Sequence, residues 1–242
     1  MRIRTAPGLW PAALALSGVL LVACGGDESS GSAAPESEAA ADGTLSGVMT
    51  LTPGDCAGGT PTGSYFRMIS PGGKPDAGPF VKNGDSTCSD KEYSLLAPGT
   101  DGGLDLGGFQ EFPDPAFDAA GNGMAGNVLK PVKFFGIDFA LACAKTDAQT
   151  KAETSAPMLT ADESGKVTGT LSCWQAAYNN AYYNQGAPKP DGSNPGFTSA
   201  GVTGTYDKAS GKVVLEWAST IVGGAFNNFG GSWHLEGTLP AA

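Results

Sequence analysis

Short segments of alternating apolar and polar residues dominate the last third of this chain. In residues 213–222, Val213, Leu215, Trp217 and Ile221 recur with a period of two, which is the period of a β-strand. The turn before this segment, residues 207–212, opens with Asp207 and ends in Ser-Gly-Lys. Asp favours turn initiation, and Gly takes the left-handed conformation that precedes a return strand. Residues 162–167 repeat the pattern, so we predict two antiparallel hairpins.

Other segments extend the β pattern along the chain. We expect strands within residues 44–51, 65–69, 92–96, 202–206 and 232–239, separated by turns such as Asn-Gly-Asp at 83–85. Residues 128–142 form the most apolar stretch, and we predict a central strand there with both faces covered. Asp138 lies inside it and would need a partner or exposure to solvent. Residues 98–127, rich in Gly, Asp and Pro, predict a long irregular loop.

Glycine and aromatic content support a folded β protein. The chain has 37 Gly and 17 Pro, yet also 11 Phe, 6 Tyr and 4 Trp, which a disordered chain would lack. A Gly-Thr pair recurs at 43–44, 169–170, 204–205 and 237–238, as expected where curved strands approach closely. Residues 173–185 alone carry a helical spacing of apolar side chains. We predict an all-β fold, an antiparallel sandwich or curved β-barrel, with long Gly/Pro-rich loops and at most one or two short helices.

The N-terminus combines a charged start with a short apolar run. Arg2 and Arg4 precede apolar residues from Leu9 to Val22, and Leu-Val-Ala then leads into Cys24. This arrangement resembles the signal peptide and lipobox of bacterial lipoproteins. A transmembrane anchor is the alternative, but Pro11 interrupts a run that is short for a spanning helix. The resemblance implies that residues 1–23 are removed and that Cys24 carries several acyl chains, which together anchor stably.

The same resemblance sets the predicted organisation and partners. Residues 24–43 have the composition of a flexible, lipidated tether, and residues 44–242 form a single β domain. We expect the protein in the bacterial cell envelope, outside the cytoplasm, at the outer membrane if two membranes are present. The formal charge of −10 argues against a nucleic-acid partner and against attraction to anionic headgroups. The lipid bilayer would therefore be contacted through acylated Cys24.

Cysteine usage fits an exported protein. With Cys24 lipidated, four cysteines remain, and an even number in an oxidising compartment predicts two disulfides. Three pairings are possible; we favour Cys56–Cys88 and Cys143–Cys173 because they close the shortest loops. A zinc site is not expected, because the chain has no Cys-x-x-Cys spacing and only one histidine, His234.

Catalytic signatures are absent from the sequence. There is no Gly-x-Ser-x-Gly elbow, and a lone strand histidine is usually structural, so no catalytic residue is assigned. Two alternatives stay open: an extracytoplasmic hydrolase using paired Asp or Glu side chains, and a calcium-dependent surface adhesion module. Calcium is the one cofactor for which the loops offer oxygen ligands. The candidate ligands are Asp101, Asp105, Asp114 and Asp118.

Aromatic residues near amides form the candidate ligand site. Their rings can stack on a ligand, although core packing explains the same pattern. The candidates are Tyr178, Tyr182, Tyr183, Trp217, Phe226 and Trp233. Residues 221–237 are similar to a group of uncharacterised exported bacterial β-proteins, which implies a β domain at the cell surface and no catalytic residues. We therefore expect a non-enzymatic lipoprotein with a binding or envelope-structural role, its partner a small apolar ligand, a glycan or another envelope component.

Overall fold

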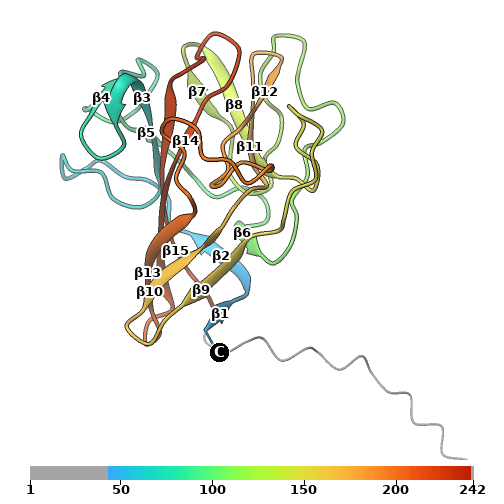
Figure 1. The fold of residues 1–242 in the computed structure, drawn as a ribbon. Helices are drawn as coiled ribbons and strands as arrows, with labels where there is room; N and C mark the ends of the chain where they lie inside the picture. Colours follow the sequence, from blue (N-terminus) through green and yellow to red (C-terminus); the bar gives the residue numbers. More distant parts are fainter. Residues whose placement is uncertain (1–42, 241–242) are drawn as a thin grey trace, which may run out of the picture. The chain divides into compact units, whose positions relative to one another are not determined.

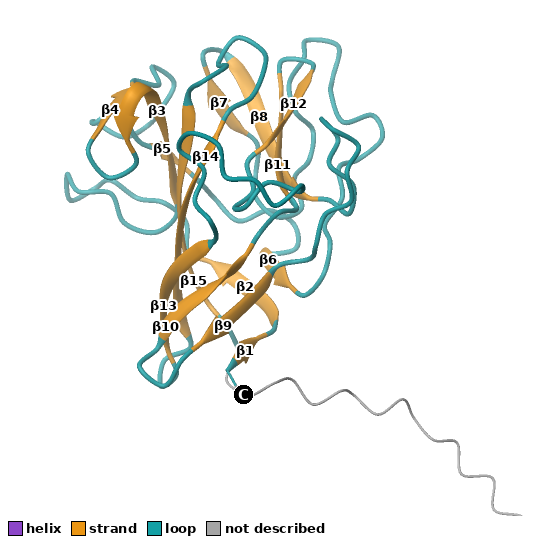
Figure 2. Ribbon diagram, viewed as in Figure 1, coloured by secondary structure: helices purple, strands orange, loops and turns teal. Residues whose placement is uncertain are grey.

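A computed structural model describes residues 43–240 and shows two antiparallel β-sheets with no helix among them. The predicted signal peptide, the lipidation site Cys24 and nearly all of the tether lie outside the described residues. Within those residues, no helix is long and apolar enough to cross a membrane. The fold class is thus the all-β class that the alternating segments predict (Figure 2).

The larger sheet has eleven strands, whose order runs β1-β9-β10-β13-β14-β15-β2-β6, with β3 also paired to β15 and carrying β4 and β5. Its strands are β1 (Thr44–Leu45), β2 (Gly47–Leu51), β3 (Tyr65–Lys74), β4 (Gly78–Val81), β5 (Ser94–Leu95), β6 (Gly103–Leu106), β9 (Met158–Ala161), β10 (Lys166–Thr170), β13 (Val202–Asp207), β14 (Lys212–Thr220) and β15 (Gly230–Thr238). Both hairpins predicted from the Ser-Gly-Lys turns are present, as β9–β10 and β13–β14.

This sheet curls into a nearly closed barrel at one end. The segment predicted as one strand over residues 44–51 breaks at Ser46 into β1 and β2. β1 pairs with β9 and β2 pairs with β15, so the two halves of one segment join opposite sides of the sheet. Gly47 allows the break because it holds a φ of 87°, which favours glycine.

Glycine lets neighbouring strands approach closely in this barrel. A Cβ on Gly204 of β13 would lie 1.8 Å from the carbonyl oxygen of Val214, and one on Gly169 of β10 would lie 2.0 Å from that of Met158. Neither distance is sterically allowed, so these positions require glycine. The recurrent Gly-Thr pairs therefore mark close strand approach, as the sequence predicts.

The smaller sheet has four strands in the order β12-β11-β8-β7. They are β7 (Val132–Phe134), β8 (Ile137–Cys143), β11 (Trp174–Tyr178) and β12 (Ala181–Asn184). Figure 1 shows this sheet facing β3 and the upper parts of β14 and β15, away from the barrel end formed by β9, β10 and β13. The two sheets enclose a second part of the core, rich in aromatic side chains.

The predicted helix over residues 173–185 is wrong. These residues form the hairpin β11–β12, with Asn179 and Asn180 at its turn. Both asparagines have positive φ angles, 49° and 58°, which suit a tight two-residue hairpin turn. Pairing of β11 with β8 buries Trp174, Gln175, Ala176 and Ala177 together, so burial on both faces produced the misleading spacing.

The apolar stretch 128–142 is divided rather than forming one central strand. It contains the hairpin β7–β8, which turns at Phe135 and Gly136, although β8 does lie between two neighbours with its last five residues buried. Asp138 is partly exposed, and its carboxylate lies 3.8 Å from the ammonium of Lys133. A further departure concerns residues 98–127, whose predicted loop includes β6.

Two disulfides join the pairs favoured from the sequence. Cys56 is bonded to Cys88, and Cys143 to Cys173. The first ties together loops on either side of β3 and β4, while the second links β8 to the residue preceding β11. Cys88, Cys143 and Cys173 are fully buried, which shields these bonds from solvent.

Candidate ligand-binding site

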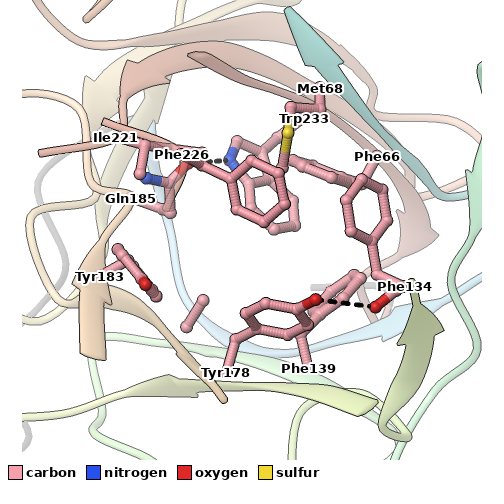
Figure 3. A pocket seen from close by; sticks show the side chains of 11 residues that line it. Phe66, Met68, Phe134, Phe139, Tyr178, Tyr183, Gln185, Ile221, Phe226 and Trp233 are labelled. Atoms are coloured by element: carbon pink, nitrogen blue, oxygen red, sulfur yellow. Dashed lines mark hydrogen bonds between the residues drawn. The ribbon is translucent and has the colours of Figure 1, made fainter. Parts of the chain in front are cut away.

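An apolar cavity lies between the two sheets. Its walls come from β3, β15 and the end of β14 on one side, and from β7, β8, β11 and β12 on the other (Figure 3). The lining residues are Phe66, Met68, Phe134, Phe139, Ala176, Tyr178, Tyr183, Gln185, Ile221, Phe226 and Trp233. It offers about 50 Å³ to the centre of a water-sized sphere. A water needs roughly 10–15 Å³ on this measure, so the space fits a few waters or one small apolar group.

Aromatic rings form most of the wall. Seven of the eleven lining residues are aromatic, and they pack mainly edge to face. The Phe66 ring lies 4.5 Å from Trp233 and 5.6 Å from Phe139, centroid to centroid. Phe134 lies 6.5 Å from Tyr178 and 5.9 Å from Phe226. These contacts fix the rings around the cavity and limit its collapse.

Two polar side chains in the wall, those of Tyr178 and Gln185, are already engaged in hydrogen bonds. The Tyr178 hydroxyl donates a hydrogen bond to the Phe134 carbonyl at 2.9 Å. The Gln185 side-chain oxygen accepts one from the Trp233 indole at 3.3 Å, and its amide nitrogen donates to the Asn184 carbonyl. The surface that faces the cavity is consequently apolar throughout. Burial raises the pKa of Tyr178 and of Tyr183, so both phenols are neutral at physiological pH.

Only two lining residues are partly exposed, and they mark the mouth. Tyr178 and Phe226 are half-buried, whereas the other lining side chains are buried. Phe226 belongs to the β14–β15 connection, and outside it Phe135 stacks at 6.1 Å between ring centroids. Phe135 is 53% exposed and holds a φ of 49°, an unusual conformation for a bulky residue. The mouth is therefore flanked by two loops, which place Phe135 and Phe226 at its edge.

A buried lysine supports one side of the cavity. The Lys189 ammonium donates hydrogen bonds to the Asn184 carbonyl at 2.6 Å, the Ser219 hydroxyl at 2.9 Å and the Thr220 carbonyl at 2.7 Å. Burial lowers the pKa of Lys189 to about 8, against the opposing influence of Asp147 and Asp191. These bonds join the end of β12 to β14 and so hold the backbone that carries Gln185.

Two stacked tryptophans connect Gln185 to the aromatic rings of the cavity wall. The indoles of Trp217 and Trp233 lie 6.0 Å apart at 16°, and both donate to Gln185, one to its backbone and one to its side chain. Trp174 meets both edge to face, and its buried indole nitrogen has no hydrogen-bond partner. The neighbouring indole rings offer at most weak π acceptors.

Four of the six predicted ligand residues line this cavity: Tyr178, Tyr183, Phe226 and Trp233. Two do not. Tyr182 alternates to the other face of β12, where it packs on Phe112 and Phe117 at 5.3 and 5.0 Å. Trp217 is buried behind Trp233. Tyr182 and Tyr183 are neighbours in β12, so their side chains point to opposite faces of the strand, which the predicted helical spacing did not anticipate.

Several lining residues were not predicted from the sequence. Phe66 and Met68 lie on β3, and Phe134 and Phe139 on the β7–β8 hairpin. Their alternation indicates a buried face, but not which other buried face it meets. That pairing is set by the packing of two sheets whose strands are far apart in sequence.

The predicted calcium ligands do not assemble. Residues 43–240 contain no group of three or more His, Cys, Asp or Glu side chains that could hold a metal ion. Asp101 accepts a hydrogen bond from Gln110 at 2.9 Å, and Asp118 accepts from Asn122 at 2.8 Å and from backbone amides of its own loop. The predicted ligands Asp105 and Asp114 join no such group either. These local bonds explain the carboxylates as loop-stabilising groups.

The single histidine is part of a surface pair. His234 shares a hydrogen bond of 2.9 Å with Glu216, and its ring stacks on Tyr65 at 4.5 Å. The hydrogen bond from His234 lowers the pKa of the Glu216 carboxyl. All three side chains lie on the sheet face opposite to the cavity, because Trp217 and Trp233 alternate with them.

The comparisons with known proteins supply no further assignment. No family model, curated protein or solved structure matches this chain.

Proposed function

We propose that this protein is a non-enzymatic, lipid-anchored binding protein of the bacterial envelope that holds a small apolar ligand in the aromatic cavity. The observation that carries the proposal is the cavity itself. Its inner surface is apolar, and its mouth is flanked by the β7–β8 and β14–β15 loops. Apolar pockets at the mouth of β folds are common ligand sites. A glycan is disfavoured as the ligand, because the Gln185 amide is already engaged with Trp233 and Asn184.

The wall chemistry favours binding over hydrolysis. The lining contains no Asp, Glu, Ser, His or Cys, and so offers no carboxylate pair and no activated nucleophile. A hydrophobic ligand of matching shape would gain free energy simply from leaving water.

The cellular location is part of the proposal. The two disulfides are consistent with an oxidising, extracytoplasmic compartment. The lipobox-like residues ending at Cys24 imply acylation and retention at a membrane, the outer one in a bacterium with two. Mass spectrometry of the N-terminal peptide from the native host tests this. A diacylglyceryl mass on Cys24 is expected, and an intact Met1 leader on the cellular pool of the protein would contradict it.

Binding is tested by titrating the full chain with small neutral hydrophobes such as toluene and indane. Trp233 lines the cavity and should report occupancy by a change in fluorescence. The variant Ala176→Leu adds three heavy atoms to a lining position and should abolish the response, because it occupies the space the ligand needs. Tyr182→Leu is the matched control, since Tyr182 lies on the same hairpin but outside the cavity.

The proposal predicts saturable binding in the wild type and in Tyr182→Leu, and none in folded Ala176→Leu. Near-ultraviolet circular dichroism establishes that each variant is folded. Equal binding by all three proteins would locate the ligand elsewhere, and no binding by the wild type would refute a hydrophobic site here.

A further inference from the structure

The aromatic wall constrains the ligand beyond being apolar. The rings of Phe66, Phe134, Phe139, Tyr178, Tyr183, Phe226 and Trp233 surround a space for one small group (Figure 3). An aliphatic pocket of the same size would suit any hydrophobe. Aromatic rings differ because their faces carry a partial negative charge, which attracts a cation within about 6 Å of the centroid.

Charges near the mouth favour a positive ligand. The Asp85 carboxylate accepts a hydrogen bond of 2.7 Å from the Gly136 amide in the β7–β8 turn, next to Phe135. After burial and the nearby Tyr183, Asp85 is a further cause of the raised pKa of Tyr178, so its field reaches this wall. The chain as a whole is strongly acidic, with a formal net charge of −10.

Described cations near the site are engaged elsewhere. No Lys or Arg lines the cavity. The Lys189 ammonium is held by three oxygen atoms, and Lys133 extends from β7 toward Asp138. Arg67 alternates with Phe66 and Met68 to the other face of β3, where it stacks over Phe80 at 3.9 Å. None of these three positive side chains therefore occupies the position at the rings that a cationic ligand would take.

The wall also selects the kind of cation. An ammonium that carries N–H groups would lose most of its hydrogen bonds to water on an apolar surface, where the Tyr178 hydroxyl and the Gln185 amide are already engaged. A quaternary ammonium has no N–H group, spreads its charge over methyl groups and loses less hydration. Its compact trimethylammonium head also matches the small size of the cavity.

We propose that the cavity binds the quaternary ammonium group of a small compound of the choline class, with the remainder of the molecule extending past Tyr178 and Phe226 into solvent. This inference rests on the proposed binding at this cavity and deepens it, because the group that enters is covered by methyl groups but carries a positive charge. The rings supply cation–π attraction, and Asp85 adds longer-range attraction at the mouth.

A pair of isosteres tests the role of charge. Choline and 3,3-dimethylbutan-1-ol have nearly the same shape, but only choline is charged. Titration calorimetry of the full chain should show choline binding about tenfold more tightly, in line with a partly desolvated cation–π interaction. Tyr178→Leu should remove most of this preference, Tyr178→Phe should keep most of it, and Tyr182→Leu should change nothing.

Asp85→Asn provides a second, electrostatic test. The amide keeps the size of the side chain, and choline affinity should fall about threefold at low salt while affinity for the neutral isostere stays constant. Equal or tighter binding of the neutral isostere by the wild type would overturn the quaternary ammonium assignment while leaving a hydrophobic site in place. Failure of choline, the isostere and the neutral hydrophobes alike would overturn both proposals.

Discussion

The two ends of this β fold are packed in different ways. At the barrel end, the buried side chains of β2, β9, β13 and β14 are aliphatic, as in Met49, Leu159, Val202 and Leu215, all at most 1% exposed. At the other end, aromatic rings from both sheets pack edge to face and leave a cavity. The pair Trp217 and Trp233, which face each other in register on β14 and β15, marks the change. The paired strands β14 and β15 therefore line a filled core at one end and a cavity at the other.

The two ends differ because different side chains determine the distance between the strands in the barrel and between the two sheets. In the barrel, glycines at positions such as Gly204 let the strands approach until small aliphatic side chains fill the space. Between the sheets, rigid rings that pack edge to face determine the spacing, and the space that they enclose stays open. Stability should therefore reside mainly in the barrel, and binding mainly in the cavity.

The largest expected effect compares one deletion at each end. Leu235→Ala removes a side chain with 0% exposure from the barrel and should lower the free energy of unfolding by about 4 kcal/mol. Met68→Ala borders a cavity that is already present, so it should cost about 2 kcal/mol. Urea denaturation measures both. A loss at Met68 equal to that at Leu235 would remove the distinction between the two ends.

Removing each disulfide separates stability from binding. The cysteine pairs are 32 and 30 residues apart, so each bond should contribute about 3–4 kcal/mol, as measured by chemical denaturation of the double alanine variants. Only loss of Cys143–Cys173 should weaken ligand binding, because it ties β8 to β11 beneath the aromatic wall. If loss of Cys56–Cys88 weakened binding equally, the loops beside β3 and β4 would also hold the cavity wall in place.

Lys189 gives the cavity end a pH dependence. Its folded-state pKa of about 8 lies below the usual 10.5, so between these values the unfolded chain binds more protons and stability rises with pH. From pH 7.5 to 9.5 the free energy of unfolding should increase by about 2 kcal/mol from this group. Lys189→Met should abolish the increase, whatever its effect on stability at one pH. A wild type whose stability is flat or falls over this interval would contradict the assignment.

The smallest effect concerns the exposed loop at the mouth. Phe135 holds a φ of 49°, so Phe135→Gly should relieve backbone strain worth about 1 kcal/mol but lose its stacking on Phe226. The net gain in unfolding free energy should be about 0.5 kcal/mol, measurable by thermal denaturation. A loss above 1 kcal/mol would show that the stacked pair stabilises the fold rather than covering the mouth.

Local patterns predicted the barrel better than the cavity. The Ser-Gly-Lys turns gave β9–β10 and β13–β14 directly, because a turn and two alternating strands are local in sequence. The hairpin β11–β12 was mistaken for a helix because Trp174, Gln175, Ala176 and Ala177 are all buried, which removes the alternation that identifies a strand. Among the predicted ligand residues, Tyr182 fell outside the cavity for a related reason, because the facing of a side chain depends on the correct secondary structure. Trp217 lies on the predicted strand face but behind Trp233.

The amino-acid sequence by itself determined the β class and the Ser-Gly-Lys turns, and it favoured the two disulfide pairs among three possible pairings, since these depend on residue types and short loops. Tertiary structure alone decided that β1 and β2 join opposite sides of one sheet, and that Phe66 of β3 meets Phe139 of β8. Alternation fixes which side chains of a strand share a face. Which faces meet is set by long-range strand pairing and by the packing of whole sheets, and the cavity exists only where those faces fail to fill the space between them.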